Sequence, residues 1–262
     1  MSRLPATILL AAALAGGSLR GEPSEYPLGI NLPTNDRMQF WDIGIAFTHR
    51  FDTPVQGHGK DAYGLDGYAY SGLGLDFGIK PIKGLNVILY RTADNKTFTM
   101  ALQQQVINGS LVRMSLRAER FDEVVDRTVT PRGTVGISGS TFLLPTEFFL
   151  GDMVILSLVP GYVSRTTSQE KGIFNVGAAL RVDITEKWAF MTEYYPRPSK
   201  IAKTYEKGFA AGFSLKTFKH RFTVVGTNAS GTTANQILSG DYAGGPRPSG
   251  KWGLGFNVAR TF

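Results

Sequence analysis

The last twelve residues, 251–262, alternate between apolar side chains and small or polar ones. One parity is apolar and consists of Trp252, Leu254, Phe256, Val258 and Phe262. The other parity consists of Gly253, Gly255, Asn257, Ala259 and Thr261. Because successive side chains of a strand point to opposite faces, the pattern predicts one apolar face, broken by Arg260, and one small or polar face. A strand of about ten residues with these faces is typical of a transmembrane β-strand, the alternative being the last strand of a soluble sheet.

The same two-faced pattern recurs upstream at hairpin spacing. In 71–80, for example, Leu73, Leu75 and Phe77 alternate with glycines and Asp76. Near the middle of the chain, Pro160 removes a ladder donor and predicts a bulge or a strand end. In all, the alternation predicts twelve strands, at 38–51, 71–80, 84–91, 97–106, 110–118, 134–144, 153–164, 174–184, 187–195, 208–218, 221–228 and 251–262.

The connections between these strands are of two kinds. Every second connection is short, at 81–83, 108–109, 145–151, 185–186 and 219–220. The others are mostly long and hydrophilic, at 52–70, 119–133, 165–172, 196–207 and 229–250, with 92–96 as the short exception. Short turns at one end and long loops at the other are typical of outer-membrane barrels. The sequence therefore predicts an all-β fold: a transmembrane antiparallel up-and-down β-barrel of about twelve strands.

The N-terminus carries the layout of a secretory signal peptide. Residues 1–15 contain Arg3 and an apolar run that ends in Ala13-Leu14-Ala15, which predicts a cleaved signal peptide with cleavage near 15–21. We expect residues 16–37 to form a periplasmic N-terminal segment and residues 38–262 to form the barrel. Since the chain has no cysteine, we expect neither a lipid anchor nor a disulfide. The net charge is +7, but no Lys/Arg stripe with aromatics indicates nucleic-acid binding.

Several motifs resemble a domain-of-unknown-function family of bacterial outer-membrane β-barrels. The segments at 63–66 (YGLD), 73–79 (LGLDFGI) and 84–87 (GLNV) resemble its front half. The closing strand at 253–262 and the turn at 227–231 resemble its end, whereas the middle of the chain matches least. The resemblance implies an outer-membrane barrel of an uncharacterised, porin-like family in a Gram-negative bacterium, and it implies no activity or catalytic residue.

Charged residues of inward parity are the candidate functional residues. Each is costly on the lipid face, by about 2 to 4 kcal/mol at mid-bilayer for Arg or Lys, so they are expected to line the lumen. A slight excess of cations among them favours anions. The alternative is a network of paired charges that fills the lumen. The candidates are Arg50, Arg113, Arg117, Arg181, Lys216, Arg221, Asp42, Asp76, Asp183 and Glu193.

These features predict a narrow channel or a small-solute binding or translocation protein. The alternatives are a closed structural or surface-interaction barrel and a secreted soluble β-protein that binds an apolar ligand. The segment 229–250 is long enough to fold into the lumen as a plug. We expect outer-membrane lipid, a small polar solute and the barrel assembly machinery as partners. That machinery would recognise the aromatic closing strand.

We expect no enzymatic activity, no metal and no cofactor. The histidines are His49, His58 and His220, and none has a partner at metal-ligand or catalytic-triad spacing. The loop residues His58, Asp61 and Asp66 do not have the spacing of a calcium loop.

Overall fold

The computed structural model describes residues 29–35, 38, 42–51, 54–55, 69–79, 82–125, 135–165, 172–196, 207–229, 231–240 and 251–262. The predicted signal peptide lies outside these residues. They form one short α-helix, α2 (Ala234–Ser239), a 3-10 turn at Asp94–Lys96, and thirteen strand segments. The strands are β1 (Ile43–Phe51), β2 (Ala69–Gly78), β3 (Leu85–Thr92), β4 (Phe98–Asn108), β5 (Val112–Val125), β6 (Val135–Leu143), β7 (Thr146–Leu150), β8 (Val154–Val163), β9 (Ile173–Asp183), β10 (Trp188–Tyr195), β11 (Gly208–Thr217), β12 (His220–Thr227) and β13 (Gly253–Thr261).

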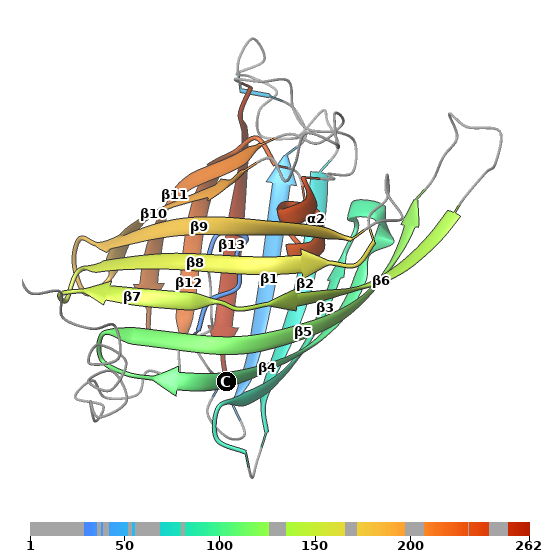
Figure 1. Ribbon diagram of the computed structural model, residues 1–262. Coiled ribbons are helices and arrows are strands. Elements are labelled where there is room, and N and C mark those ends of the chain that lie inside the picture. The colour runs from blue at the N-terminus through green and yellow to red at the C-terminus, as the bar shows by residue number, and fades with distance from the viewer. Residues whose placement is uncertain are drawn as a thin grey trace, which may run out of the picture.

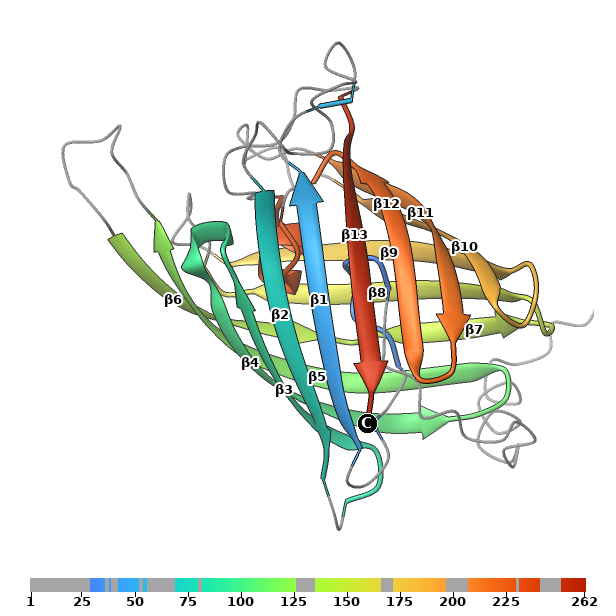
Figure 2. The same cartoon turned by 180° about the vertical axis from the view of Figure 1, so that it is seen from behind.

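The strands form one closed antiparallel sheet (Figures 1 and 2). The sheet follows chain order from β1 through β4, and the pairing of β4 with β5 and of β1 with β13 completes the ring. A closed ring leaves no edge strand whose backbone groups would face lipid unpaired. The predicted antiparallel barrel is confirmed.

The thirteen segments occupy twelve positions, because β6 and β7 are two parts of one spanning strand. Leu143 of β6 pairs with Arg117, and Thr146 of β7 pairs with Met114, so the two pairs are three positions apart on both strands. The register against β8 is continuous in the same way. The predicted number of strands is therefore confirmed.

The two faces of the barrel differ as the alternation predicts. On the outer face Leu73, Phe213 and Val224 are between 50% and 65% exposed. Inward neighbours such as Ala46 and Asp76 are buried. Lipid requires the first set to be apolar, while the interior accepts small and polar side chains. Within the described residues, no helix has the length and hydropathy that a membrane span requires.

The outer face supplies a depth-dependent test. Val224 lies near the middle of β12 and faces outward, so Val224→Arg is expected to lower the free energy of unfolding in lipid vesicles by about 2 to 4 kcal/mol. His220, at the end of the same strand, is the matched control, and His220→Arg is expected to cost about 0 to 1 kcal/mol. Urea titration measures both, and equal costs would contradict the assigned membrane depth.

Three details of the predicted strands are wrong. β5 does not end at Ala118 but continues to Val125, and the predicted turn at 145–151 is mostly strand, because Thr146–Leu150 pairs with both neighbours. Pro160 lies inside β8 without a strand end. Its missing N–H is tolerated because it lies opposite the interruption between β6 and β7, where the Leu144 N–H donates to the Pro160 carbonyl.

Candidate functional site: a lumen with two inserts

Residues 29–35 lie inside the barrel, where we call them the N-terminal insert. Figure 1 shows this segment in blue behind the front strands, and Ile30, Leu32 and Asn35 are each at most 4% exposed. The prediction of a periplasmic segment over 16–37 is therefore corrected for this part. A sequence rich in Gly, Pro and Asn resembles an exposed linker, but here inward side chains of the wall bond backbone N–H and carbonyl groups of residues 30–32, 34 and 35.

Glu193 of β10 holds one side of the N-terminal insert. Its carboxylate accepts hydrogen bonds from the backbone N–H groups of Ile30 at 2.5 Å, Asn31 at 2.9 Å and Leu32 at 3.3 Å. The Tyr195 hydroxyl also donates to this carboxylate. Three consecutive amides directed at one carboxylate form an anion-binding nest, which the wall itself occupies.

Arg50 and Asn257 hold the opposite side of the N-terminal insert. The Arg50 guanidinium donates to Asn31 Oδ1 at 2.8 Å and to the Ile30 carbonyl at 3.4 Å. Asn257 Nδ2 donates to the same Ile30 carbonyl at 2.9 Å, and Asn257 Oδ1 accepts from Arg50 at 2.8 Å. Since Arg50 lies on β1 and Asn257 on β13, these contacts join the insert to the first and last strands.

A third set of contacts comes from β4 and β7. Gln103 Nε2 donates to the Thr34 carbonyl at 2.9 Å, and Gln105 Nε2 donates to the Asn35 carbonyl at 3.2 Å. The Asn35 N–H donates to Glu147 at 3.2 Å. The N-terminal insert is thus attached by polar contacts on several sides and extends across the lumen.

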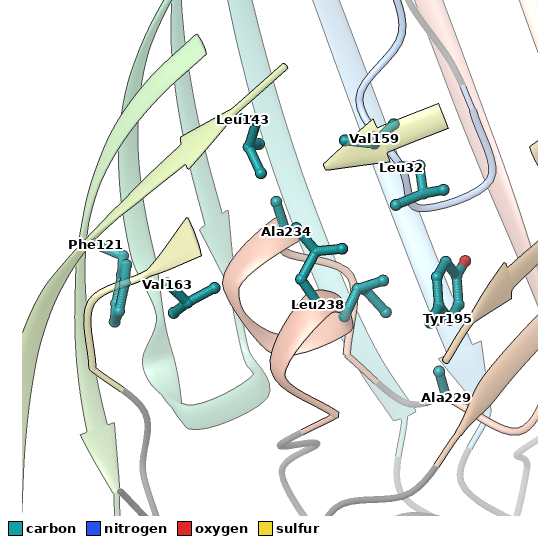
Figure 3. Close-up of a cluster of buried hydrophobic side chains, with 10 residues drawn as sticks. Leu32, Phe121, Leu143, Val159, Val163, Tyr195, Ala229, Ala234 and Leu238 are labelled. Carbon is teal, nitrogen blue, oxygen red and sulfur yellow. The ribbon is translucent and has the colours of Figure 1, made fainter. Parts of the chain in front are cut away.

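Residues 231–240, the helical insert, enter from the long-loop end and include α2. Ile237 and Leu238 are fully buried and pack in an apolar cluster with wall residues that include Phe121 and Val163 (Figure 3). Polar contacts fix the other face, where Asn235 Nδ2 donates to Glu123 at 2.6 Å. This position agrees with the expectation that part of 229–250 folds into the lumen.

A cavity of about 830 Å³, the large cavity, lies on the short-turn side of the N-terminal insert. Its mouth is formed by exposed residues of the β7–β8 and β9–β10 turns, so it opens at that end. Its wall combines apolar side chains such as Ile155 and Met191 with charges of both signs. Arg181 pairs with Asp183 at 2.7 Å, and the Arg113 guanidinium lies 4.7 Å from the centre of the Phe149 ring. The cavity can accommodate a small polar solute.

The predicted lumen residues fall into separate groups. Arg50 binds the N-terminal insert, and Asp42 precedes β1 with a half-buried side chain. Arg221 is buried and directly opposite Lys216 in the sheet. Asp76 and Arg117 line a smaller cavity between the inserts. The large cavity is lined by Arg113, Arg181, Lys216, Asp183 and Glu193.

Three inward glutamates were not among the predicted lumen residues. They are Glu119, Glu123 and Glu147, and each is at most 5% exposed. Glu119 and Glu123 were assigned to a connection because neighbouring charges such as Arg120 and Asp122 point outward and obscure the alternation. Glu147 was assigned to the predicted turn at 145–151. With them the inward acids of the described residues are no longer fewer than the inward cations, so the predicted cationic excess is wrong for this part of the chain.

The closing strand places its apolar parity on the outer face. Phe256 packs against the rings of Phe47 and His49, with centroids 5.9 and 5.1 Å apart. Trp252 packs edge-on against Phe209 at 4.1 Å, and the Arg260 guanidinium lies 4.6 Å from the ring centre of Phe262. Recognition of this strand by the assembly machinery stays a prediction.

Residues 149–262 match a family model described as "Membrane bound beta barrel domain (DUF5777)". This protein is a bacterial outer-membrane β-barrel. The resemblance to a domain-of-unknown-function barrel family is confirmed over the matched residues, which include the closing strand and begin after the front-half motifs. No curated protein matches the chain.

Several solved structures resemble this outer-membrane barrel. A NanC porin structure aligns with 6% identity and a TM-score of 0.46, covering 84% of this chain and 98% of its own. LpxR from Salmonella typhimurium aligns with 9% identity and a TM-score of 0.39, covering 84% and 99%. Salmonella typhi OmpF in complex with daunomycin aligns with 8% identity and a TM-score of 0.39, covering 84% and 97%.

Proposed function

We propose that this outer-membrane barrel is a gated channel for small polar solutes and that the N-terminal insert is its gate. The observation that carries the proposal is the position of this insert, which lies across the lumen directly beside a cavity of about 830 Å³. A solute that enters the large cavity meets the backbone of residues 29–34 as the next barrier.

Position distinguishes the two inserts. Both bury apolar side chains, because Leu32 lies in the same apolar cluster as Ile237 and Leu238, and Ile30 lies in a second one. The N-terminal insert, however, lines both the large cavity and the smaller one, whereas the helical insert lines only the smaller one. Movement of the N-terminal insert would therefore join the two cavities while the helical insert stays. The hydrogen bonds that hold it are replaced by water at a net cost of about 0.5 to 1.5 kcal/mol each, or more for charged groups.

The second candidate function is a closed structural or surface-interaction barrel. The apolar cluster favours it, because Leu143, Val159 and Leu238 pack in the lumen as residues do in a solid protein core (Figure 3). Conductance in planar bilayers separates the two functions. The channel requires ion current from the barrel at least after its N-terminal insert is replaced, and a silent barrel in both forms would support the closed alternative.

The charges of the large cavity give a test of the solute pathway. Arg113→Glu together with Lys216→Glu replaces two lining cations by anions and is expected to shift the reversal potential in a salt gradient toward cation preference. Arg120→Glu, which reverses an exposed outer-face charge on β5, is expected to leave the reversal potential unchanged. An unchanged potential in the double variant would remove the large cavity from the pathway.

A further inference from the structure

A second, smaller cavity of about 100 Å³ lies between the two inserts, and we call it the small cavity. Its lining combines residues 29–34, residues 232–234 and inward side chains of β1 to β5. Three of its lining residues carry a formal charge, namely Asp76, Glu119 and Arg117. Two carboxylates against one guanidinium give the small cavity a net negative charge.

Asp76 is the residue of this cavity whose charge is least compensated. It is 0% exposed, and neither of its carboxylate oxygens accepts a hydrogen bond from the described residues. The Phe77 backbone and the Arg117 guanidinium attract its negative charge. Arg117, however, is engaged elsewhere, because its Nε donates to Glu119 Oε1 at 2.7 Å and its Nη1 donates to Gln103 at 3.3 Å. A buried carboxylate with so little compensation is unfavourable unless it takes up a proton or a further positive charge lies beside it.

The other atoms around the small cavity that lack hydrogen bonds are also oxygens. Among the described residues they are Glu119 Oε2 and the hydroxyls of Thr34 and Thr99. Carboxylate and hydroxyl oxygens are the ligands of hard cations. The described residues contain no cluster of three His, Cys, Asp or Glu side chains, which is the arrangement that transition metals and many divalent sites require.

We propose that the small cavity binds one hard monovalent metal cation of the size of sodium, with Asp76 as its principal ligand. One positive charge balances the net charge of Asp76, Glu119 and Arg117, whereas a divalent cation would leave an excess. The volume of about 100 Å³ admits an ion with a few waters but no larger solute. Because the cavity is bounded by both inserts, the bound ion holds the N-terminal insert, the helical insert and the wall together.

Sodium dependence of unfolding tests this site without requiring any current, so its failure is distinguishable from failure of the channel. The purified barrel is heated in detergent, and folded and unfolded chains are separated by their electrophoretic migration. We expect sodium chloride to raise the unfolding midpoint above that in choline chloride of equal ionic strength, because an ion that binds only the folded state stabilises it. Calcium chloride at matched ionic strength is expected to be less effective than sodium chloride. Equilibrium dialysis with radioactive sodium is expected to give one bound ion per chain.

Asp76→Asn tests whether the buried charge lowers the unfolding temperature when sodium is absent. Without the buried charge, the variant is expected to lose the sodium dependence and to unfold at a higher temperature than the unmodified protein in choline chloride. Asp122→Asn, an exposed position on the outer face of β5, is expected to keep the dependence. Equal midpoints in sodium and choline for the unmodified protein, or a sodium dependence that persists in Asp76→Asn, would overturn the proposal. The first outcome would mean that Asp76 is neutralised by a proton instead.

Discussion

Replacing residues 30–35 by a glycine-serine sequence of equal length is expected to raise the mean ion conductance of the barrel by about tenfold or more. Tenfold corresponds to about 1.4 kcal/mol in a barrier, which is less than the summed contribution of the hydrogen bonds from Glu193, Arg50 and Asn257. The measurement is single-channel recording in planar bilayers at fixed salt. The unmodified protein is expected to open rarely, because all these contacts must break together.

A single methyl group provides a milder version of the same change. A Cβ at Gly29 would lie 2.7 Å from Glu193 Oε1 and closer still to the Leu32 carbonyl oxygen, so Gly29→Ala must displace the N-terminal insert. We expect more frequent openings of unchanged size. Gly136→Ala is the matched control, because a Cβ there meets no atom within 4 Å. Identical recordings from the glycine-serine replacement, Gly29→Ala, Gly136→Ala and the unmodified protein would exclude the N-terminal insert as the gate.

Glu193→Ala is expected to increase amide hydrogen exchange at residues 30–32 by about a hundredfold or more. The substitution removes the acceptor of three backbone N–H groups, and a hydrogen bond to a charged group contributes about 1.5 to 3 kcal/mol. Since 1.4 kcal/mol is a factor of ten, two such bonds account for this change. Mass spectrometry of peptides from the N-terminal insert measures it.

Two further variants separate loss of this anchor from general disturbance of the lumen. Glu193→Gln keeps an acceptor oxygen without the charge, so its exchange rate is expected to lie between those of the alanine variant and the unmodified protein. Asp183→Ala removes a carboxylate of the same large cavity that pairs with Arg181, and it is expected to leave exchange at residues 30–32 unchanged. If the alanine variants at 183 and 193 behave alike, Glu193 is not a specific anchor.

The barrel was predictable from the sequence because lipid enforces the alternation that specifies it. In the middle of β2 and of β13 the outward positions are apolar, so parity alone distinguishes the two faces. The constraint ends where the strand leaves the membrane. In the last residues of β5, Arg120 and Asp122 face water as Glu119 and Glu123 face the lumen, and a charged strand then looks like a loop.

The candidate site was less predictable because it depends on contacts between distant parts of the chain. Ile30 and Glu193 meet across 163 positions, and Arg50 and Asn257 across 207. Parity identified Arg50, Asp76 and Glu193 as inward, but no local pattern indicates which backbone will reach them. A segment whose backbone is bonded by wall side chains needs no periodicity of its own, so its sequence resembles a linker.

The Ile30 carbonyl accepts hydrogen bonds from Arg50 on β1 and from Asn257 on β13, which are neighbours in the finished ring but lie at opposite ends of the chain. These two donors come together only when the last strand has joined the first. During biogenesis, the Ile30 carbonyl can therefore make both of these contacts only after the first and last strands have paired. A barrel stalled with an unpaired seam would leave these residues accessible to proteases.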